Sequence, residues 1–211
     1  MSETNETEGF FTAHFEILCG ITLAVFAAFL AINDLGAGKF GDDELIAYGL
    51  GQQSFAWYAS KGLKENLAEG QIGLLQSLID AGTIPAENRA GIEKNLADLK
   101  ADVARYKKEK KEILLGSKAV GEANWVQDID GEMGKVTGAK EHEATAAGLG
   151  KAGDLFDMAT LFLQLCLVIG AISLILKGPG SKKLFYGACV VLGLVGAVYS
   201  VIAFVQAFAV V

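Results

Sequence analysis

The chain has 211 residues, of which 52% are hydrophobic and 20% are charged, and its formal net charge is −7. This hydrophobic content is high for a soluble domain with so much charge, so the average combines two kinds of segment. Nearly all charged residues lie between Asp34 and Asp157. Their mildly acidic, mixed charge argues against nucleic acid as a partner.

The N-terminal part predicts a short acidic segment, residues 1–14, followed by a transmembrane helix over residues 15–33. The first apolar run, from Ile17 to Ile32, is short for a span, and aromatic residues before it extend it into the interface. No Lys or Arg lies between Met1 and Glu8. We therefore expect no cleaved signal peptide and a retained first span.

Residues 34–157 predict an extramembrane helical hairpin with a coiled-coil character. Its outgoing arm, Asp42 to Asp80, lacks proline and carries apolar or small residues at Ala56, Ala59, Leu63, Leu67, Leu74 and Leu78. The turn before Pro85 reverses the chain, with Thr83 as the expected N-cap and Pro85 in the first helical turn. The return arm has a heptad seam, broken only by Lys110, at Ile92, Leu96, Leu99, Val103, Tyr106 and Ile113.

Glycines are frequent in the second half of this segment and weaken a continuous helix there. They are Gly116, Gly121, Gly131, Gly134, Gly138, Gly148, Gly150 and Gly153. We expect an interrupted segment near Ala119 to Gly138 before the chain returns to the membrane.

Two more transmembrane helices are predicted over residues 158–176 and 184–211, joined by a loop at 177–183. The loop contains Lys177, Lys182 and Lys183, and lysine in short loops is retained on the cytoplasmic side. We expect the N-terminus inside and the central segment outside. In a bacterium this gives a multi-pass inner-membrane protein with a periplasmic central segment.

Small residues recur at helical spacing in the spans and predict close helix packing, within one chain or between copies. Together with the return-arm seam, they give the candidate packing and assembly residues: Gly20, Ala24, Gly170, Gly193, Ala197, Ser200, Leu96, Leu99, Val103 and Tyr106. Gln164 and Gln206 are polar residues at membrane depth that we expect to bond across helices. Membrane lipids and further copies, or a larger membrane complex, are the expected partners.

No constellation for catalysis is evident, and we predict no catalytic, cofactor-binding or metal site. The two histidines, His14 and His142, are far apart in the sequence, and Cys19, Cys166 and Cys189 lie in apolar stretches as packing residues. The segment Asp128–Glu132 does not complete a calcium loop. Phe55, Trp57 and Tyr58 either anchor at the membrane interface or fill the hairpin seam.

The segment QSFAWYASKGLK, Gln53 to Lys64, and the segment FDMATLFLQ, Phe156 to Gln164, resemble a bacterial membrane family, DUF4337. Trp57, Tyr58 and Lys61 carry the more distinctive part of the likeness. The chain departs from the family pattern in Ser54 and Phe55, in the residue after Tyr58 and in the glycines before the second span. The resemblance implies an all-α layout of spans and a helical insertion, and it supplies no function.

These observations favour a non-enzymatic inner-membrane scaffold or accessory subunit that assembles through its hairpin and its small-residue faces. The alternative is an oligomeric channel or transporter component, in which Gln164 or Gln206 lines a pore. An enzyme is the least favoured class.

Overall fold

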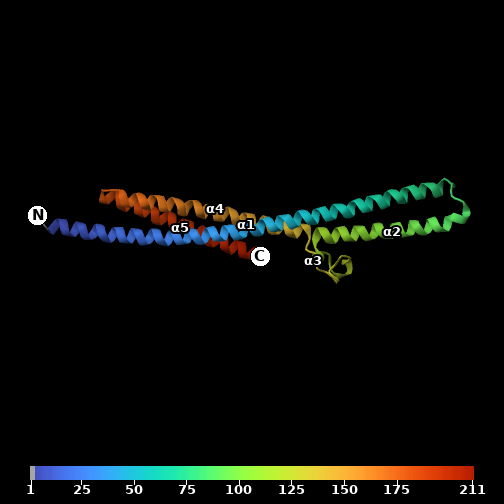
Figure 1. The fold of residues 1–211 in the computed structure, drawn as a ribbon, viewed down its shortest axis with the longest axis horizontal. Coiled ribbons are helices and arrows are strands. Elements are labelled where there is room, and N and C mark those ends of the chain that lie inside the picture. Colours follow the sequence, from blue (N-terminus) through green and yellow to red (C-terminus); the bar gives the residue numbers. More distant parts are fainter. Residues whose placement is uncertain (1–2) are drawn as a thin grey trace. The chain divides into compact units, whose positions relative to one another are not determined.

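The computed structural model describes residues 3–211, with side chains described from His14 onward. The prediction for residues 1–14 therefore lies largely outside the described side chains. The fold is all-α apart from two very short strands (Figure 1). Its elements are α1 (Glu3–Asp80), α2 (Ala86–Leu115), α3 (Ser117–Val120), the 3-10 helix η1 (Glu122–Asn124), β1 (Asp128–Ile129), β2 (Glu132–Met133), α4 (Ala139–Ile175) and α5 (Pro179–Val210).

The chain forms two compact units, and α1 and α4 each run without a break from one into the other. The first unit combines the chain up to Glu44 with Ala147–Val211, and the second is Leu45–Ala146. The predicted transmembrane helix 15–33 and the predicted outgoing arm are therefore parts of one continuous helix, α1. Likewise, α5 begins inside the predicted loop 177–183, which shortens that loop.

The first unit packs α1, α4 and α5 together. On α1, four buried residues spaced seven positions apart face the other two helices: Cys19, Phe26, Asn33 and Phe40. Phe40 stacks on Phe156 with ring centroids 5.9 Å apart, and Phe204 meets Phe156 edge-on at 5.0 Å. The three helices are long and apolar enough to cross a membrane.

The second unit contains the predicted hairpin, in which α2 runs back along the outer part of α1 (Figure 1). The turn differs in detail from the prediction. Pro85 is the N-cap of α2, and the Thr83 hydroxyl donates to the Leu78 carbonyl at 2.9 Å. Thr83 therefore caps the end of α1 and not the start of α2.

The face of α1 that meets α2 is also not the one expected. The apolar positions predicted for the outgoing arm, from Ala56 to Leu78, are exposed. The inward positions are buried or half-buried and mix polar with apolar residues: Tyr58, Lys61, Glu65, Ala68, Ile72, Leu75 and Ile79. The hydrophobic pattern predicted the wrong face of α1, because charged residues in ion pairs occupy much of the face that meets α2.

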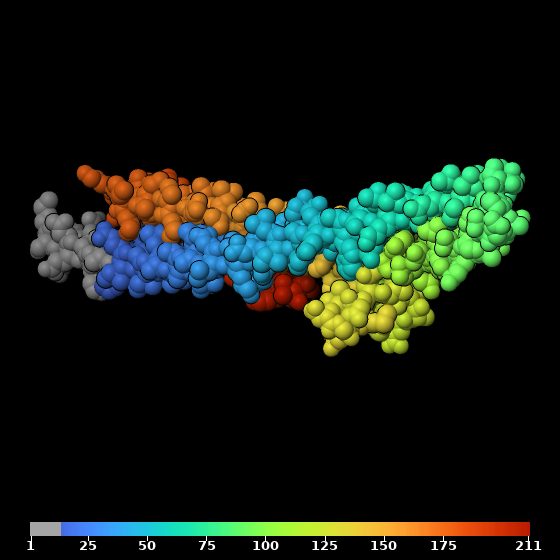
Figure 2. Space-filling model, turned by 45° about the vertical axis from the view of Figure 1, so that its right-hand side comes forward, coloured from blue at the N-terminus to red at the C-terminus, as the bar shows by residue number. Residues whose placement is uncertain are grey.

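The expected interruption between Ala119 and Gly138 is confirmed. Residues 116–138 form a small module with α3, η1 and the β1–β2 hairpin, which stands out from α2 (Figure 2). Gly116 ends α2 with a φ of 88°, a conformation that favours glycine. A Cβ at Gly138 would overlap the backbone of Leu115 and Gly116, so the chain crosses itself here only because Gly138 has no side chain.

The glycines that follow this module do not interrupt the helix, although glycine weakens an isolated helix. Gly148, Gly150 and Gly153 lie inside the continuous helix α4. A Cβ at Gly148 would meet the Val210 side chain at 2.8 Å, and one at Gly150 would meet the Glu44 carboxylate at 3.0 Å. Close packing of neighbouring side chains thus offsets the low helix propensity of these two glycines.

Candidate functional site

Ion pairs between α1 and α2 join the two arms of the hairpin. Lys61 Nζ lies 2.6 Å from Glu109 Oε2, and Lys110 Nζ donates to Glu65 Oε2 at 2.9 Å. Both carboxylates are buried, and they belong to opposite helices. Each pair therefore fixes the register of the arms, because a slip of one turn would leave a buried carboxylate without its lysine.

The Lys110 ammonium is held by two groups of α1. It lies 5.0 Å from the centre of the Tyr58 ring, in addition to its bond to Glu65. The hydrogen bond and charge of Glu65 raise the pKa of Lys110 above its ordinary value of 10.5. Of the family-like residues, Tyr58 and Lys61 thus face α2, and Trp57 is half-buried beside them.

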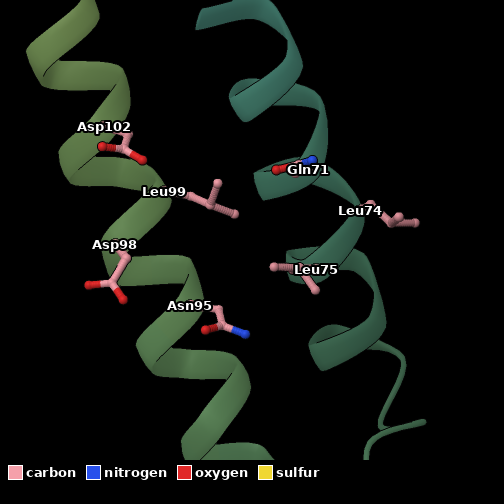
Figure 3. Close-up of a pocket in the computed structure, with 7 residues that line it drawn as sticks. All are labelled: Gln71, Leu74, Leu75, Asn95, Asp98, Leu99 and Asp102. Carbon is pink, nitrogen blue, oxygen red and sulfur yellow. The ribbon is translucent and has the colours of Figure 1, made fainter. Parts of the chain in front are cut away.

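The predicted seam of α2 lies on the side that faces α1. Leu96, Val103 and Ile113 are buried, whereas Ile92, Leu99, Tyr106 and Lys110 are half-buried. Near the tip an open groove of about 440 Å³ separates the helices, lined by Gln71, Leu74, Leu75, Asn95, Asp98, Leu99 and Asp102 (Figure 3). Leu75 and Leu99 point into it, and Leu74 points away from α2. The arms are therefore less tightly packed here than at the ion pairs.

The outer face of α1 exposes leucines that nothing covers within the described residues. Leu63, Leu67, Leu74 and Leu78 are 62%, 59%, 62% and 38% exposed. Single exposed leucines are common on protein surfaces, whereas these four lie along one face of a helix and form a continuous apolar row.

A buried carboxylate, Glu112, organises the module that follows α2. Its side chain is 0% exposed and accepts three hydrogen bonds, from Ser117 Oγ at 2.7 Å, Val126 N at 2.8 Å and Gln127 N at 2.9 Å. The Trp125 indole donates to the Ser117 carbonyl at 2.8 Å. Glu112 therefore connects the end of α2 to a loop more than ten residues away in the sequence.

Glu112 was not predicted from the sequence, although a signal is present. It lies in the last turn of α2, where a carboxylate faces the negative end of the helix dipole. A glutamate in that position, followed by Gly116 and Ser117, indicates a compensating set of donors. The donors Val126 and Gln127 themselves have no sequence signature, because they bind through backbone amides.

In the first unit, the predicted packing residues divide into two groups. Gly170 and Gly193 are buried, and a Cβ at Gly193 would overlap the Phe26 ring. Ser200 is also buried and Ala197 is half-buried. Gly20 and Ala24, in contrast, are exposed, and a Cβ at Gly20 would meet nothing within 4 Å.

The polar residues of the predicted spans are not arranged as expected. Gln164 is exposed and Gln206 half-exposed, and neither bonds across the helices of the described chain. A buried polar link is made instead by Asn33, which is fully buried and donates to the Phe156 carbonyl at 3.1 Å and to Thr160 Oγ1 at 2.8 Å. Asn33 stands in a heptad position, where a polar residue specifies register.

The three cysteines are buried and unpaired. Cys166 Sγ lies 3.4 Å from Cys189 Sγ, and Cys19 Sγ lies 3.3 Å from Ser173 Oγ. Among the residues that the structure describes, no group of three or more His, Cys, Asp or Glu side chains is placed to hold a metal ion. The cysteine contacts join the packed helices α1, α4 and α5.

Comparison with curated proteins found no match, and comparison with solved structures found none. A family defined as a domain of unknown function, DUF4337, matches residues 15–206. That range includes α2, the module after it and α4, and most of α1 and α5. The chain therefore belongs to the DUF4337 family.

Proposed function

We propose that this chain is a non-enzymatic membrane scaffold or accessory subunit, with three spans that hold a helical hairpin on one side of a membrane. The observation that carries the proposal is the surface of the three apolar helices. Ile21, Val168 and Val198, one from each helix, are more than half exposed. Apolar surface of this extent is costly in water and favourable in lipid.

The hairpin supports a role in assembly. Its inner charged groups Lys61, Glu65, Glu109 and Lys110 are used in ion pairs that hold the arms together. Groups used in this way stiffen the arms and keep an outer face fixed for a partner. A rigid projection with a constant surface suits a scaffold better than a reactive site.

The orientation is inferred from three lysines, one between α4 and α5 and two near the start of α5. Lys177, Lys182 and Lys183 favour the cytoplasmic side, which puts the hairpin outside and, in a bacterium, in the periplasm. Lys182 lies 3.3 Å from Glu16, which supports placing the start of the first span at the same membrane surface as this loop.

Two measurements test the proposal. Cells expressing Ala97→Cys or Ser181→Cys are labelled with a membrane-impermeant maleimide; both positions are exposed, whereas the native cysteines are buried. We expect labelling at position 97 and none at 181 in intact cells. The mass of the detergent-solubilised particle is then measured, and we expect more than one protein chain.

Each measurement has a contradicting outcome. Labelling at position 181 in intact cells would reverse the orientation. A solitary monomer would contradict a scaffold or subunit. Ion flux through liposomes that contain only this chain would favour the channel alternative.

A further inference from the structure

The outer face of α1 in the second unit carries a regular row of leucines and small residues. The row, here called the leucine stripe, consists of Leu45, Gly49, Ala56, Ser60, Leu63, Leu67, Gly70, Leu74 and Leu78. All of its members are exposed, and a Cβ at Gly49 or Gly70 would meet nothing within 4 Å. Another helix can therefore approach this face closely.

The spacing of the stripe differs from that of the inner face. Leu45, Ala56, Leu67 and Leu78 are 11 residues apart, as are Leu63 and Leu74. An 11-residue repeat, about 3.67 residues per turn, drifts slowly around a helix and favours a right-handed supercoil. The stripe therefore suits a second helix that lies alongside α1 from Leu45 to Leu78 with a slight right-handed twist.

We propose that the leucine stripe is the interface between two copies of this chain, which pack α1 against α1 in parallel. The inference rests on the proposed membrane function, because two copies inserted in one membrane with the same orientation run in the same direction. A parallel pair about a two-fold axis brings identical residues together. Leu67 then lies near Leu67 of the second copy, and Leu74 near its counterpart.

Charge favours a second copy at this face. The positions beside the stripe include Gln53, Asn66, Gln71 and Gly73, and the charged one among the flanking positions is Lys64. Two identical faces therefore bring few like charges together, with Lys64 at the edge of the face. The exposed side of α2, in contrast, carries many charges of both signs, among them Glu93, Lys94, Asp98, Lys100, Lys108 and Lys111, and is costlier to cover with an identical face.

The area is sufficient for a specific contact. From Leu45 to Leu78 a helix rises about 50 Å, and a face about 10 Å wide gives roughly 500 Å² from each copy. The total of roughly 1,000 Å² reaches the size expected of a biological interface. In the first unit, α1 also exposes Gly20, Ala24, Ala27 and Ala31, which would add area in lipid.

Cysteine cross-linking in membranes tests this interface with the full chain. Leu67→Cys and Leu74→Cys place single exposed thiols on the stripe, whereas Ala97→Cys and Ala104→Cys place them on the exposed side of α2 as matched controls. With copper phenanthroline and dioxygen as the oxidant, we expect a disulfide-linked dimer from both stripe variants, at least tenfold more than from either control. The native cysteines are buried and give the background.

Lysine substitutions test the same face without cross-linking. Leu67→Lys with Leu74→Lys should reduce the mass of the detergent-solubilised particle, and Ala97→Lys with Ala104→Lys should not. Equal cross-linking on both sides, or cross-linking of the stripe to a different protein, overturns the proposal. If a stable complex persists while the stripe variants do not cross-link, this inference fails and the scaffold stands; a solitary monomer would refute both.

Discussion

Removing the Glu112 carboxylate should release the module that follows α2. The carboxylate accepts hydrogen bonds from Ser117 Oγ, Val126 N and Gln127 N, and its side chain is fully buried. Hydrogen bonds to a charged acceptor contribute about 1.5–3 kcal/mol each, and their sum is less than additive. Glu112→Ala therefore should cost about 3–5 kcal/mol, because two backbone amides also lose their acceptor.

Glu112→Gln removes the negative charge and keeps the shape of the side chain, so it measures the contribution of the charge. The amide keeps one acceptor oxygen and turns an NH₂ group toward donors, so we expect a cost of about 2 kcal/mol. Every 1.4 kcal/mol is a factor of ten in an equilibrium constant. Local opening of residues 126–136 should then rise at least tenfold in the glutamine variant and at least a hundredfold in the alanine variant.

Hydrogen–deuterium exchange measured by mass spectrometry gives the readout. Peptides that contain Val126, Gln127 and Val136 should exchange faster, while peptides around Val103 in the middle of α2 should be unchanged. Glu122→Ala, which removes an exposed acid from the same module, is the matched control. Unchanged exchange of the 126–136 peptides in Glu112→Ala would refute the reasoning, because the loop would then be held by other contacts.

Three further predictions concern the hairpin and the bundle. Lys61→Met should destabilise the hairpin by roughly 2 kcal/mol in thermal unfolding, because Glu109 stays buried without its lysine. Loss of the exposed Arg89–Glu93 pair should cost less than about 0.5 kcal/mol. Equal effects of the two changes would contradict a role for burial. Gly193→Ala should reduce the free energy of unfolding by about 1–3 kcal/mol, because the new methyl group overlaps the Phe26 ring. Gly20→Ala, where space is open, should be neutral or stabilising. A neutral Gly193→Ala would show that the Phe26 ring moves freely. The Lys110–Glu65 contribution should be complete below pH 10.5 and lost as the pH rises through the raised pKa of Lys110, so an alkaline titration of stability should fall less steeply in Lys110→Met than in the parent chain.

Much of the layout could be predicted from the sequence because hydropathy and glycine are strong local signals. The all-α fold, the reversal before Pro85 and the interruption between Ala119 and Gly138 depend on such signals. The inner face of α1 could not be predicted in the same way. Lys61 and Glu65 are paired across the seam by residues more than forty positions away, and a pattern of apolar residues within one helix carries no information about those partners.

Asn33 and Glu112 were missed for a related reason. Both are polar residues whose burial is made favourable by backbone atoms elsewhere in the chain, the Phe156 carbonyl for Asn33 and two amides for Glu112. Backbone donors and acceptors are present at every residue, so the sequence does not mark the ones that are used. At Gly148 and Gly150, residues that weaken an isolated helix permit close packing inside the bundle, and composition alone does not reveal that role.

The glycines of α1 connect the packing of one chain to its assembly. A glycine inside a helix costs about 1 kcal/mol relative to alanine. A Cβ at Gly36 would overlap the Phe204 ring, so close approach offsets the cost there, whereas one at Gly51 would make an ordinary contact, 3.5 Å from His142. No such neighbour lies within 4 Å at a second set, namely Gly20, Gly38, Gly41, Gly49, Gly70 and Gly73. A single chain gains nothing from them, whereas an α1 from a second copy packed along the leucine stripe would approach Gly49 and Gly70 closely and make their lack of a side chain favourable.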